Sequence, residues 1–144
     1  MQVTEIMSKP PITIALDDSL AEVLEVFEHA RIRFIPVVEQ RKLFGVIDKA
    51  DVLKAISPYV FSHIHTTRDL ATLQRRVHEI VKRKPVFLPQ QATVEQAIAL
   101  FNTHSVGCLP VCDEQDIPIG IVTRSDVLKH FQAICQALRP GVSS

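Results

Sequence analysis

One stretch of this chain occurs twice, and it constrains the fold more than any other feature. The segment from Gly45 to Asp51 (GVIDKAD) returns from Gly120 to Asp126 (GIVTRSD), at an offset of 75 residues (126 − 51 = 75). Upstream segments match in the same order, residues 34–38 with 108–112 at an offset of 74 (108 − 34 = 74) and residues 6–12 with 80–86. Ordered matches of this length indicate a tandem repeat of one supersecondary unit.

Each copy predicts the element order strand, helix, strand, strand, helix, with short first strands at residues 12–14 and 86–88. The first helix of each copy opens with a capping box, Ser19 with Glu22 and Thr93 with Gln96. Apolar residues then follow at the spacing of an amphipathic helix. They are Leu20, Val23, Leu24 and Phe27 in the first copy, and Val94, Ala97, Ile98 and Phe101 in the second.

A hairpin follows in each copy, formed by residues 34–38 with 43–47 and by residues 108–112 with 117–122. Its strands are almost continuously apolar, which predicts that both of their faces are covered. Pro36 and Pro110 lack a ladder N–H, so we expect them at a sheet edge or at the start of a strand. The turn of the hairpin absorbs the one-residue difference between the two offsets. Between the copies, residues 69–82 predict one helix.

One copy alone exposes more apolar surface than it can cover, so the two copies are expected to form one folded module. The predicted fold class is mixed α+β, in which each motif has a small β-sheet and two helices and the motifs pack with pseudo-two-fold symmetry. The module spans residues 1–144. We expect the first motif over 1–57, a linker over 58–76, the second motif over 77–135 and a flexible tail over 136–144.

The composition argues against several classes of function. Sixteen basic and 16 acidic residues give a net charge of zero, which argues against nucleic-acid and membrane-surface partners. No apolar run approaches the ~18 residues that a membrane span needs, and the N-terminus lacks the layout of a signal peptide. We therefore expect a cytoplasmic protein without membrane insertion.

The sequence gives little support to metal or catalytic chemistry. Cys108 and Cys112 flank a strand-like run and are predicted to be buried thiols, while His63 and His65 have no acidic or cysteine partner at ligand spacing. No metal site is predicted. The chain has no signature of a nucleophile with its base, and its four glycines form no phosphate-binding loop, so we predict no catalytic residue and no enzymatic activity.

The repeated pattern resembles the CBS (cystathionine-beta-synthase) domain family, whose paired motifs form a Bateman module. The most specific elements are the strand Leu109-Pro110-Val111 and the segment from Gly120 to Asp126, which looks like the nucleotide motif of the family. The resemblance covers nearly the whole chain apart from part of the linker and the tail. It implies antiparallel packing of the two motifs, a disc-shaped homodimer, and two clefts that hold AMP, ADP, ATP or S-adenosylmethionine.

The residues of the second segment suit such a ligand. Asp126 offers two acceptor oxygens to the vicinal hydroxyls of a ribose, and Thr123 offers a hydroxyl to a phosphate. Both stand at a helix start, where free N–H groups favour an anion. Thr123 with Asp126, and Asp48 with Asp51, also have the spacing of a helix cap, so capping alone explains both pairs. The two interpretations are compatible, and both stay open at this point.

The resemblance implies that each cleft takes residues from both motifs. In one cleft Asp126, Thr123 and Ser125 face Pro11, Ile12, Ile32 and Arg33; in the other, Asp51 faces Pro85, Val86, Val106 and Gly107. Ile12 and Ile32 would flank the adenine. Arg33 either reaches a phosphate or is a surface cation beside Glu28 or Glu39. The first copy departs from the motif at Asp48, whose carboxylate repels phosphate, so the Asp51 cleft is predicted to be weak for phosphorylated ligands.

These inferences predict a non-catalytic regulatory module that binds an adenosine-type nucleotide and senses energy state or a metabolite on behalf of a separate effector protein. No obligatory cofactor is expected. Two alternatives stay open: a structural or dimerisation module without a ligand, and an unrecognised nucleotide-processing enzyme.

Overall fold

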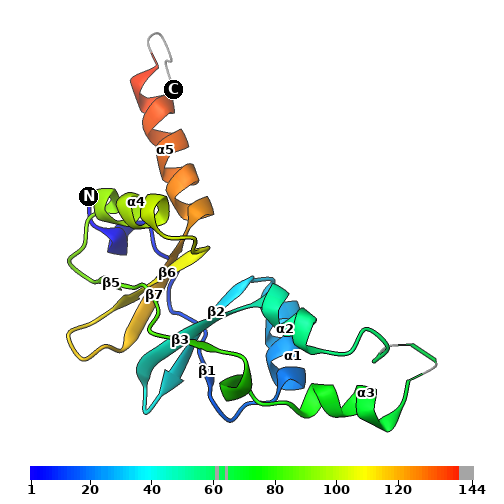
Figure 1. Cartoon of the computed structure of the whole chain (residues 1–144). Helices are drawn as coiled ribbons and strands as arrows, with labels where there is room; N and C mark the ends of the chain where they lie inside the picture. Colours follow the sequence, from blue (N-terminus) through cyan, green and yellow to red (C-terminus); the bar gives the residue numbers. More distant parts are fainter. Residues whose placement is uncertain (61, 64, 140–144) are drawn as a thin grey trace. The chain divides into compact units, whose positions relative to one another are not determined.

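The computed structural model describes residues 1–60, 62–63 and 65–139, and the chain divides into two compact units. Unit 1 joins residues 1–11 to the part of the chain from Val86 onward, and unit 2 runs from Ile12 to Pro85. Each unit contains a small sheet and helices (Figure 1). The predicted mixed α+β class is therefore confirmed.

Unit 2 is built on a four-stranded sheet of order β1-β2-β3-β4, in which β1 is parallel to β2 and the other neighbours are antiparallel. Its strands are β1 (Ile14–Ala15), β2 (Phe34–Glu39), β3 (Lys42–Asp48) and β4 (Lys82–Arg83). Its α-helices are α1 (Leu20–Ala30), α2 (Lys49–Ala55) and α3 (Thr67–Ala71), followed by the 3₁₀ turns η2 (Thr72–Gln74) and η3 (Val77–Glu79).

Unit 1 is built on a three-stranded sheet of order β5-β6-β7, with β5 parallel to β6 and β6 antiparallel to β7. Its elements are the 3₁₀ turn η1 (Val3–Glu5), β5 (Leu88–Pro89), α4 (Val94–Thr103), β6 (Cys108–Cys112), β7 (Pro118–Thr123) and α5 (Arg124–Leu138). Helix α5 includes residues 136–138 of the segment predicted as a tail, and residues 140–144 lie outside the described part of the chain.

The predicted starts of the first helices are confirmed, with one difference between the copies. Thr93 and Gln96 form the full reciprocal box, since Thr93 Oγ1 accepts from Gln96 N at 3.1 Å and Gln96 Oε1 accepts from Thr93 N at 2.9 Å. The buried hydroxyl of Ser19 accepts from Glu22 N at 3.2 Å, which is the forward half of the box. Both helices therefore begin where a side chain replaces a missing backbone partner.

The two predicted hairpins are also confirmed, but the expectation for the prolines is wrong. Pro36 and Pro110 lie in β2 and β6, the second strand of each sheet order and thus interior strands. Strand β1 pairs with β2 only at Val37 and Val38, so on that side the proline stands beyond the paired stretch. The sheet therefore tolerates the missing N–H because the parallel neighbour is only two residues long.

The single helix predicted over residues 69–82 is wrong. Helix α3 ends at Ala71, and the chain then forms two 3₁₀ turns and the edge strand β4. The backbone groups that would continue the helix bond elsewhere: Val77 N–H donates to Asp18 O at 2.9 Å, and His78 N–H donates to Leu16 O at 3.0 Å. Tertiary hydrogen bonds thus override the helical periodicity of this segment.

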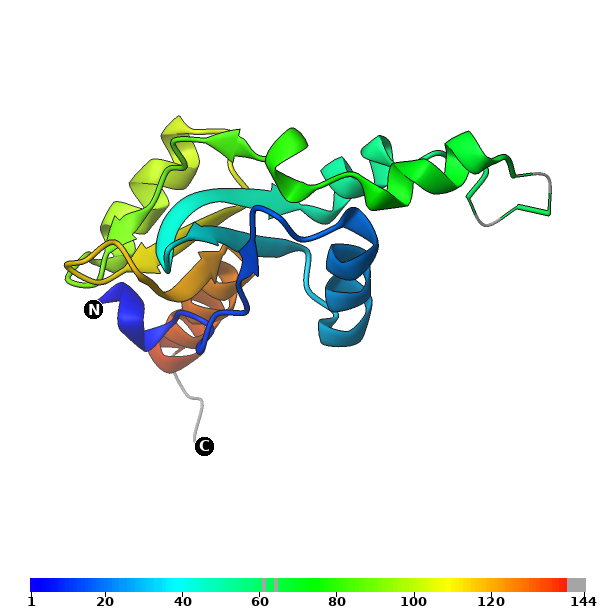
Figure 2. The ribbon, with the colours of Figure 1, turned by 90° about the horizontal axis from the view of Figure 1, so that it is seen from below.

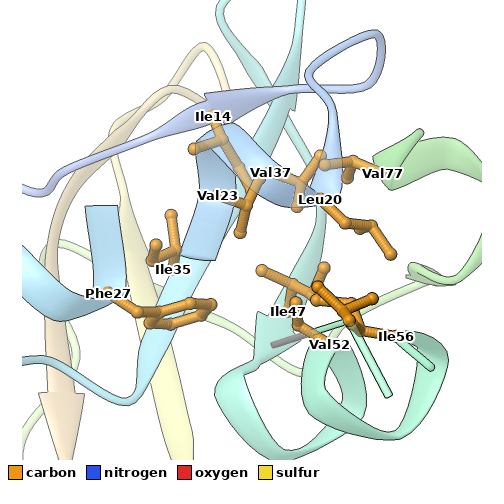
Figure 3. Packing of buried hydrophobic residues seen from close by; sticks show 11 residues of the cluster. Ile14, Leu20, Val23, Phe27, Ile35, Val37, Ile47, Val52, Ile56 and Val77 are labelled. Atoms are coloured by element: carbon orange, nitrogen blue, oxygen red, sulfur yellow. The ribbon is translucent and has the colours of Figure 1, made fainter. Parts of the chain in front are cut away.

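The core of unit 2 lies between α1, α2 and the sheet. Leu20, Val23 and Phe27 of α1 point toward the buried strand residues Ile35 and Ile47 (Figure 3). The other labelled residues of the cluster are Ile14 of β1, Val37 of β2, Val52 of α2, Ile56, which directly follows α2, and Val77. Burial of each such side chain contributes about 1.5–3 kcal/mol relative to exposure, so this cluster holds the first-copy helices on their sheet.

Unit 1 includes an N-terminal segment, residues 1–11, that is distant in sequence from the rest of the unit. Ser8 and Ile121 exchange two backbone hydrogen bonds, with N···O distances of 2.9 and 3.1 Å, and Val3 N–H donates to Ala92 O at 2.9 Å. Val3 is fully buried in the core of this unit. The dark-blue N-terminal segment accordingly runs beside the orange strand β7 in Figures 1 and 2. Unit 2 has the matching arrangement, in which β4 pairs with β3.

The absence of a side chain at Gly45 and Gly120 allows a neighbouring segment to lie close to each hairpin, residues 81–82 at Gly45 and residues 7–8 at Gly120. A Cβ on Gly45 would overlap the carbonyl oxygen of Lys82 and lie 2.8 Å from Cγ2 of Val81. A Cβ on Gly120 would overlap Sδ of Met7 and lie 3.0 Å from the carbonyl oxygen of Ser8. Neither glycine adopts a positive φ, so close approach of the neighbouring segment explains both positions.

Candidate functional site

The start of α5 carries the most regular polar arrangement of the repeated segments. Thr123 Oγ1 accepts from Asp126 N at 3.2 Å, and Asp126 Oδ2 accepts from Thr123 N at 2.8 Å, which completes a reciprocal capping box. Both residues are half-buried. Among the described residues, only Oδ2 of this carboxylate takes part in a hydrogen bond, so Oδ1 is available to accept from a ligand hydroxyl. Capping and ligand binding are therefore compatible at Asp126.

Asp126 also lines a small pocket within unit 1. The pocket has a volume of about 270 Å³ and is lined by Ile6, Asp126, Lys129 and His130. This volume is near the lower end for small-molecule pockets, which are about 300–1,000 Å³. The lining combines an apolar wall, one carboxylate, one ammonium group and one imidazole, and these groups can meet a ribose, a phosphate and an apolar ring edge.

Three of the four residues that line this pocket, Ile6, Lys129 and His130, were not predicted as site residues from the sequence. Lys129 and His130 follow Asp126 by three and four positions on α5, which places all three residues on the same face of this helix. That spacing is a signal that the sequence already contained. Ile6 lies on the N-terminal segment of unit 1, and the repeat pattern gave no reason to place it beside α5.

The equivalent helix start in the first copy is different. Asp48 Oδ1 accepts from Ala50 N at 2.9 Å and caps α2, but no reciprocal bond from Asp51 is present among the described residues. Asp51 stands in the first turn of this seven-residue helix and is half-buried. Both copies therefore have a side-chain cap at this helix start. In the second copy the carboxylate of Asp126 bonds back to the cap residue, and in the first copy the carboxylate belongs to the cap residue Asp48 itself.

Asp48 has a second partner, Arg33, which the sequence did not predict. Arg33 Nε donates to Asp48 Oδ1 and Arg33 Nη2 donates to Asp48 Oδ2, both at 3.3 Å. The guanidinium also lies 5.1 Å from the ring centroid of Phe34. The acidic neighbour of Arg33 is therefore Asp48, rather than the Glu28 or Glu39 considered from the sequence. Its proposed contact with a phosphate stays a prediction.

Arg33 lines a second pocket, within unit 2. Its volume is about 610 Å³, and its lining residues are Phe27, Glu28, Arg31, Ile32, Arg33 and Lys49. Lys49 Nζ lies 3.3 Å from Glu28 Oε1, so this pocket contains a second ion pair. Ile32 and Arg33, both predicted as site residues, are thus brought together in one pocket.

The remaining predicted site residues are distributed over the two units. Unit 1 contains Pro11, Ser125, Val86, Val106 and Gly107, and unit 2 contains Ile12 and Pro85. Ile12 and Ser125 are exposed, and the others are half-buried. Val106 O accepts from Arg124 Nε at 3.2 Å, which ties it to the start of α5. The predicted pairing of Asp126 with Ile12, Ile32 and Arg33, and of Asp51 with Val86, Val106 and Gly107, joins residues of different units and stays a prediction.

Two of the cysteines are buried in strand β6, and the third is exposed on α5. No group of three or more His, Cys, Asp or Glu residues in the described part of the chain is arranged to hold a metal ion. Cys108 and Cys112 are buried, as predicted. Burial, reinforced by the negative charges of Asp116 and Asp113, raises the pKa of the Cys112 thiol to about 12. This thiol is therefore protonated near neutral pH and a poor nucleophile or ligand.

No helix among residues 1–60, 62–63 and 65–139 has both the length and the apolar character that a bilayer span requires.

Comparison with known sequences identifies both copies. A family model described as "CBS domain" matches residues 3–58 and 77–133. A CBS domain-containing protein of Dictyostelium discoideum is 32% identical over 140 residues, which is 96% of each of the two chains. The chain spans only part of other curated relatives from Methanocaldococcus jannaschii. It covers 46% of the uncharacterized protein MJ1225, to which it is 28% identical, and 23% of two proteins with enzyme names.

Solved structures agree with this result. The CBS domain pair of protein MJ0100, in complex with 5′-methylthioadenosine and S-adenosyl-L-methionine, has a TM-score of 0.77 and 26% identity, covering 93% of this chain and 98% of its own. The structure of CBSX2 of Arabidopsis thaliana in complex with AMP has a TM-score of 0.75 over 93% and 98% of the two chains, and its 22% identity supports the fold alone.

Proposed function

Because the chain belongs to the CBS domain family, we propose that it is a regulatory, non-catalytic module that binds an adenosine-type nucleotide. The ligand is AMP, ADP, ATP or S-adenosylmethionine, held in a cleft between the two motifs. The module senses energy state or a metabolite and passes the signal to a separate effector protein. A homodimer in the cytoplasm is the form in which we expect it to act.

The observation that carries this proposal is the Asp126 pocket of unit 1. A half-buried carboxylate is fixed there by Thr123 N–H, with one oxygen available, and a lysine and a histidine line the same pocket. A carboxylate that accepts from vicinal hydroxyls recognises a ribose, and the neighbouring ammonium group of Lys129 favours a phosphate. A 26% identical CBS pair of the same fold binds two adenosine compounds, which supports this chemistry.

In this proposal the predicted residues take distinct roles. Asp126 binds the ribose, Thr123 and Ser125 bind phosphate oxygens, and Pro11, Ile12 and Ile32 enclose the adenine. Arg33 contributes a cation to the phosphate. The second cleft, formed by Asp51 with Pro85, Val86, Val106 and Gly107, is the weaker one for phosphorylated ligands because Asp48 adds a negative charge to it.

Regulation then follows from differential affinity. A ligand that prefers one arrangement of the two motifs shifts the population toward that arrangement, by an amount set by the ratio of its affinities. An effector protein that prefers the same arrangement then binds more tightly. Linkage requires that the effector raise the affinity for the ligand by the same factor by which the ligand raises the affinity for the effector.

The test is a thermal-shift panel with AMP, ADP, ATP, adenosine and S-adenosylmethionine, followed by calorimetry with any ligand that gives a shift. A ligand at 100 times its Kd should stabilise the protein by about 2.7 kcal/mol, and Asp126→Ala should remove this stabilisation. The matched control is Asp51→Ala, the same position in the first copy, which should retain the AMP shift. Wild-type protein that responds to none of the five ligands would show the proposal to be wrong.

Asp126→Ala also removes one half of the capping box of α5 and can lower the stability of the protein without any effect on the ligand. Thr123→Asp therefore provides a second variant. Aspartate is as good an N-cap as threonine, and the first copy has it at the matching position Asp48. Thr123→Asp should therefore keep the melting temperature within a few degrees of wild type. It should weaken AMP because it places a carboxylate where the phosphate binds.

A second candidate function, dimerisation without a ligand, is favoured by the outer face of α5. Leu128, Phe131 and Leu138 of this helix are 66%, 60% and 75% exposed and recur at helical spacing. If assembly is the whole function, Phe131→Glu should convert dimer to monomer in light scattering while the ligand panel stays silent. Ile98→Glu, at an exposed isoleucine of α4, is the control and should leave the mass unchanged.

A further inference from the structure

The pocket of unit 2 contains an arrangement of charge that the second copy lacks. Its cations are Arg31, Arg33 and Lys49, its lining acid is Glu28, and Asp48 is bonded to Arg33. Three cations and two acids give this group a formal charge of +1 (3 − 2 = 1). The pocket is therefore only weakly positive, although three cationic side chains stand in it or at its rim.

The ion pair between Arg33 and Asp48 is specific to the first copy, because neither residue has a charged counterpart in the second copy. Gly107 takes the place of Arg33 at the 74-residue offset (107 − 33 = 74), and Thr123 takes the place of Asp48 at the 75-residue offset (123 − 48 = 75). The cap itself is retained in both copies, since Thr123 caps α5 as Asp48 caps α2. The carboxylate of Asp48 is thus not required for capping, and its charge is the property that distinguishes the two copies.

The geometry of Asp48 engages both of its oxygens. Oδ1 accepts from Ala50 N at 2.9 Å and from Arg33 Nε at 3.3 Å, and Oδ2 accepts from Arg33 Nη2 at 3.3 Å. The Asp48 side chain is 24% exposed and that of Arg33 is 67% exposed. The acid is therefore held by the helix start, and the cation is the more exposed partner. Exposed ion pairs are weak, so an anion can draw Arg33 away, but it must then lie next to an uncompensated carboxylate.

We propose that Asp48 sets the charge selectivity of this pocket, by holding Arg33 and opposing any phosphate that competes for it. The pocket then discriminates against AMP, ADP and ATP in favour of adenosine ligands that are neutral or cationic at the same end, such as S-adenosylmethionine. This inference rests on the proposed binding of adenosine-type ligands and specifies which class of them the pocket of unit 2 prefers.

Asp48→Asn tests the proposal with little risk to the fold, because asparagine caps helices as well as aspartate does. Calorimetry with AMP should show about a three- to tenfold gain in affinity, since one negative charge within several ångströms of the phosphate is removed. ADP should gain at least as much. Adenosine should change by less than twofold, and S-adenosylmethionine should not gain. A gain for adenosine equal to that for AMP would overturn the proposal.

Two further variants separate the role of Arg33 from a general charge effect. In Arg33→Gln with Asp48→Asn, the gain for AMP should disappear because the released cation is missing. Glu28→Gln removes an acid from the same pocket, but one that pairs with Lys49, and it should give a smaller gain than Asp48→Asn. Equal gains for Glu28→Gln and Asp48→Asn, or a gain that survives in the double variant, would refute a specific role for the Arg33–Asp48 pair.

Pyrophosphate serves as a probe that does not depend on nucleoside binding. Its titration, followed by the NMR signal of Arg33 Nε–H, should reach half-saturation at a three- to tenfold lower concentration in Asp48→Asn than in wild type. No change in this midpoint would overturn the inference, whatever the nucleotide panel shows. Wild-type protein that binds no adenosine ligand, with a pyrophosphate midpoint that does shift, would instead reject the proposed function and keep the selectivity of the pocket.

Discussion

Replacement of Gly45 by alanine should destabilise the protein more than the same change at Gly120. At Gly45 the new methyl group meets the carbonyl oxygen of Lys82, which is backbone, and lies 2.8 Å from the branched side chain of Val81. The carbonyl belongs to β4, which pairs with β3 at Gly45 and Val46. Relief of the overlap therefore requires that the edge strand move away from its neighbour.

The size of this effect follows from two contributions. Overpacking of a tight contact costs about 1–3 kcal/mol. Displacement of β4 weakens ladder hydrogen bonds that contribute roughly 0.5–1.5 kcal/mol each. We expect Gly45→Ala to lower the free energy of unfolding by about 2–4 kcal/mol. At Gly120 the nearest atoms are Sδ and Cγ of Met7, a flexible side chain that can repack, so we expect about 1–2 kcal/mol there.

The assay is urea denaturation followed by circular dichroism, with the slope m compared among variants to verify a common transition. Met7→Ala provides the control, because it opens the space that the new methyl group needs at Gly120 and should make the double variant more stable than the sum of the single changes predicts. A cost below 0.5 kcal/mol for Gly45→Ala, or a larger cost at Gly120, would refute the packing explanation (~0.5 kcal/mol being the usual limit for surface changes).

Three further outcomes follow from local features. Arg41 adopts a φ of 70° in the β2–β3 turn, so Arg41→Gly should raise the free energy of unfolding by about 0.5–1 kcal/mol in the same urea assay. The hydroxyl of Ser57 donates to Asp69 at 2.6 Å and lowers the pKa of Asp69. The stability that this bond contributes is complete above pH 3.8 and is lost as pH falls through the folded-state pKa. Ser57→Ala should therefore raise that pKa in a carboxyl NMR titration. At pH 8 a thiol reagent should label Cys135, which is exposed, and leave Cys112 unmodified in the native protein; rapid labelling of Cys112 would contradict the pKa of about 12.

Much of the fold was predictable from the sequence because each copy confirmed the other. The hairpins and the caps at Ser19, Thr93 and Thr123 depend on short-range patterns, and these patterns occur at matched positions in both copies. The segment 69–82 was mispredicted because its backbone donors bond to residues 16–18 of the preceding copy. Helical periodicity contains no information about such distant acceptors.

The candidate site was predictable only in part, for a related reason. Asp126 and Thr123 were predicted from the repeated segment and its resemblance to the CBS nucleotide motif. Lys129 and His130 follow Asp126 at helical spacing, which the sequence also contains. The contact of Arg33 with Asp48 was not predictable, because it joins the start of one strand to the end of the next through side-chain geometry. A tandem repeat reveals which positions correspond, but not which side chains meet.

The division of the chain into a continuous and an interrupted unit has a consequence for its synthesis. Every strand of unit 2 has been translated once Arg83 is made, whereas Ser8 must wait for Ile121, 113 residues later (121 − 8 = 113). At about 5–20 residues per second, this delay is on the order of ten seconds. Throughout that time Ser8 and its neighbours have no strand β7 to join, and a chaperone or a neighbouring nascent chain can bind them. The emergence of β7 from the ribosome ends this exposure.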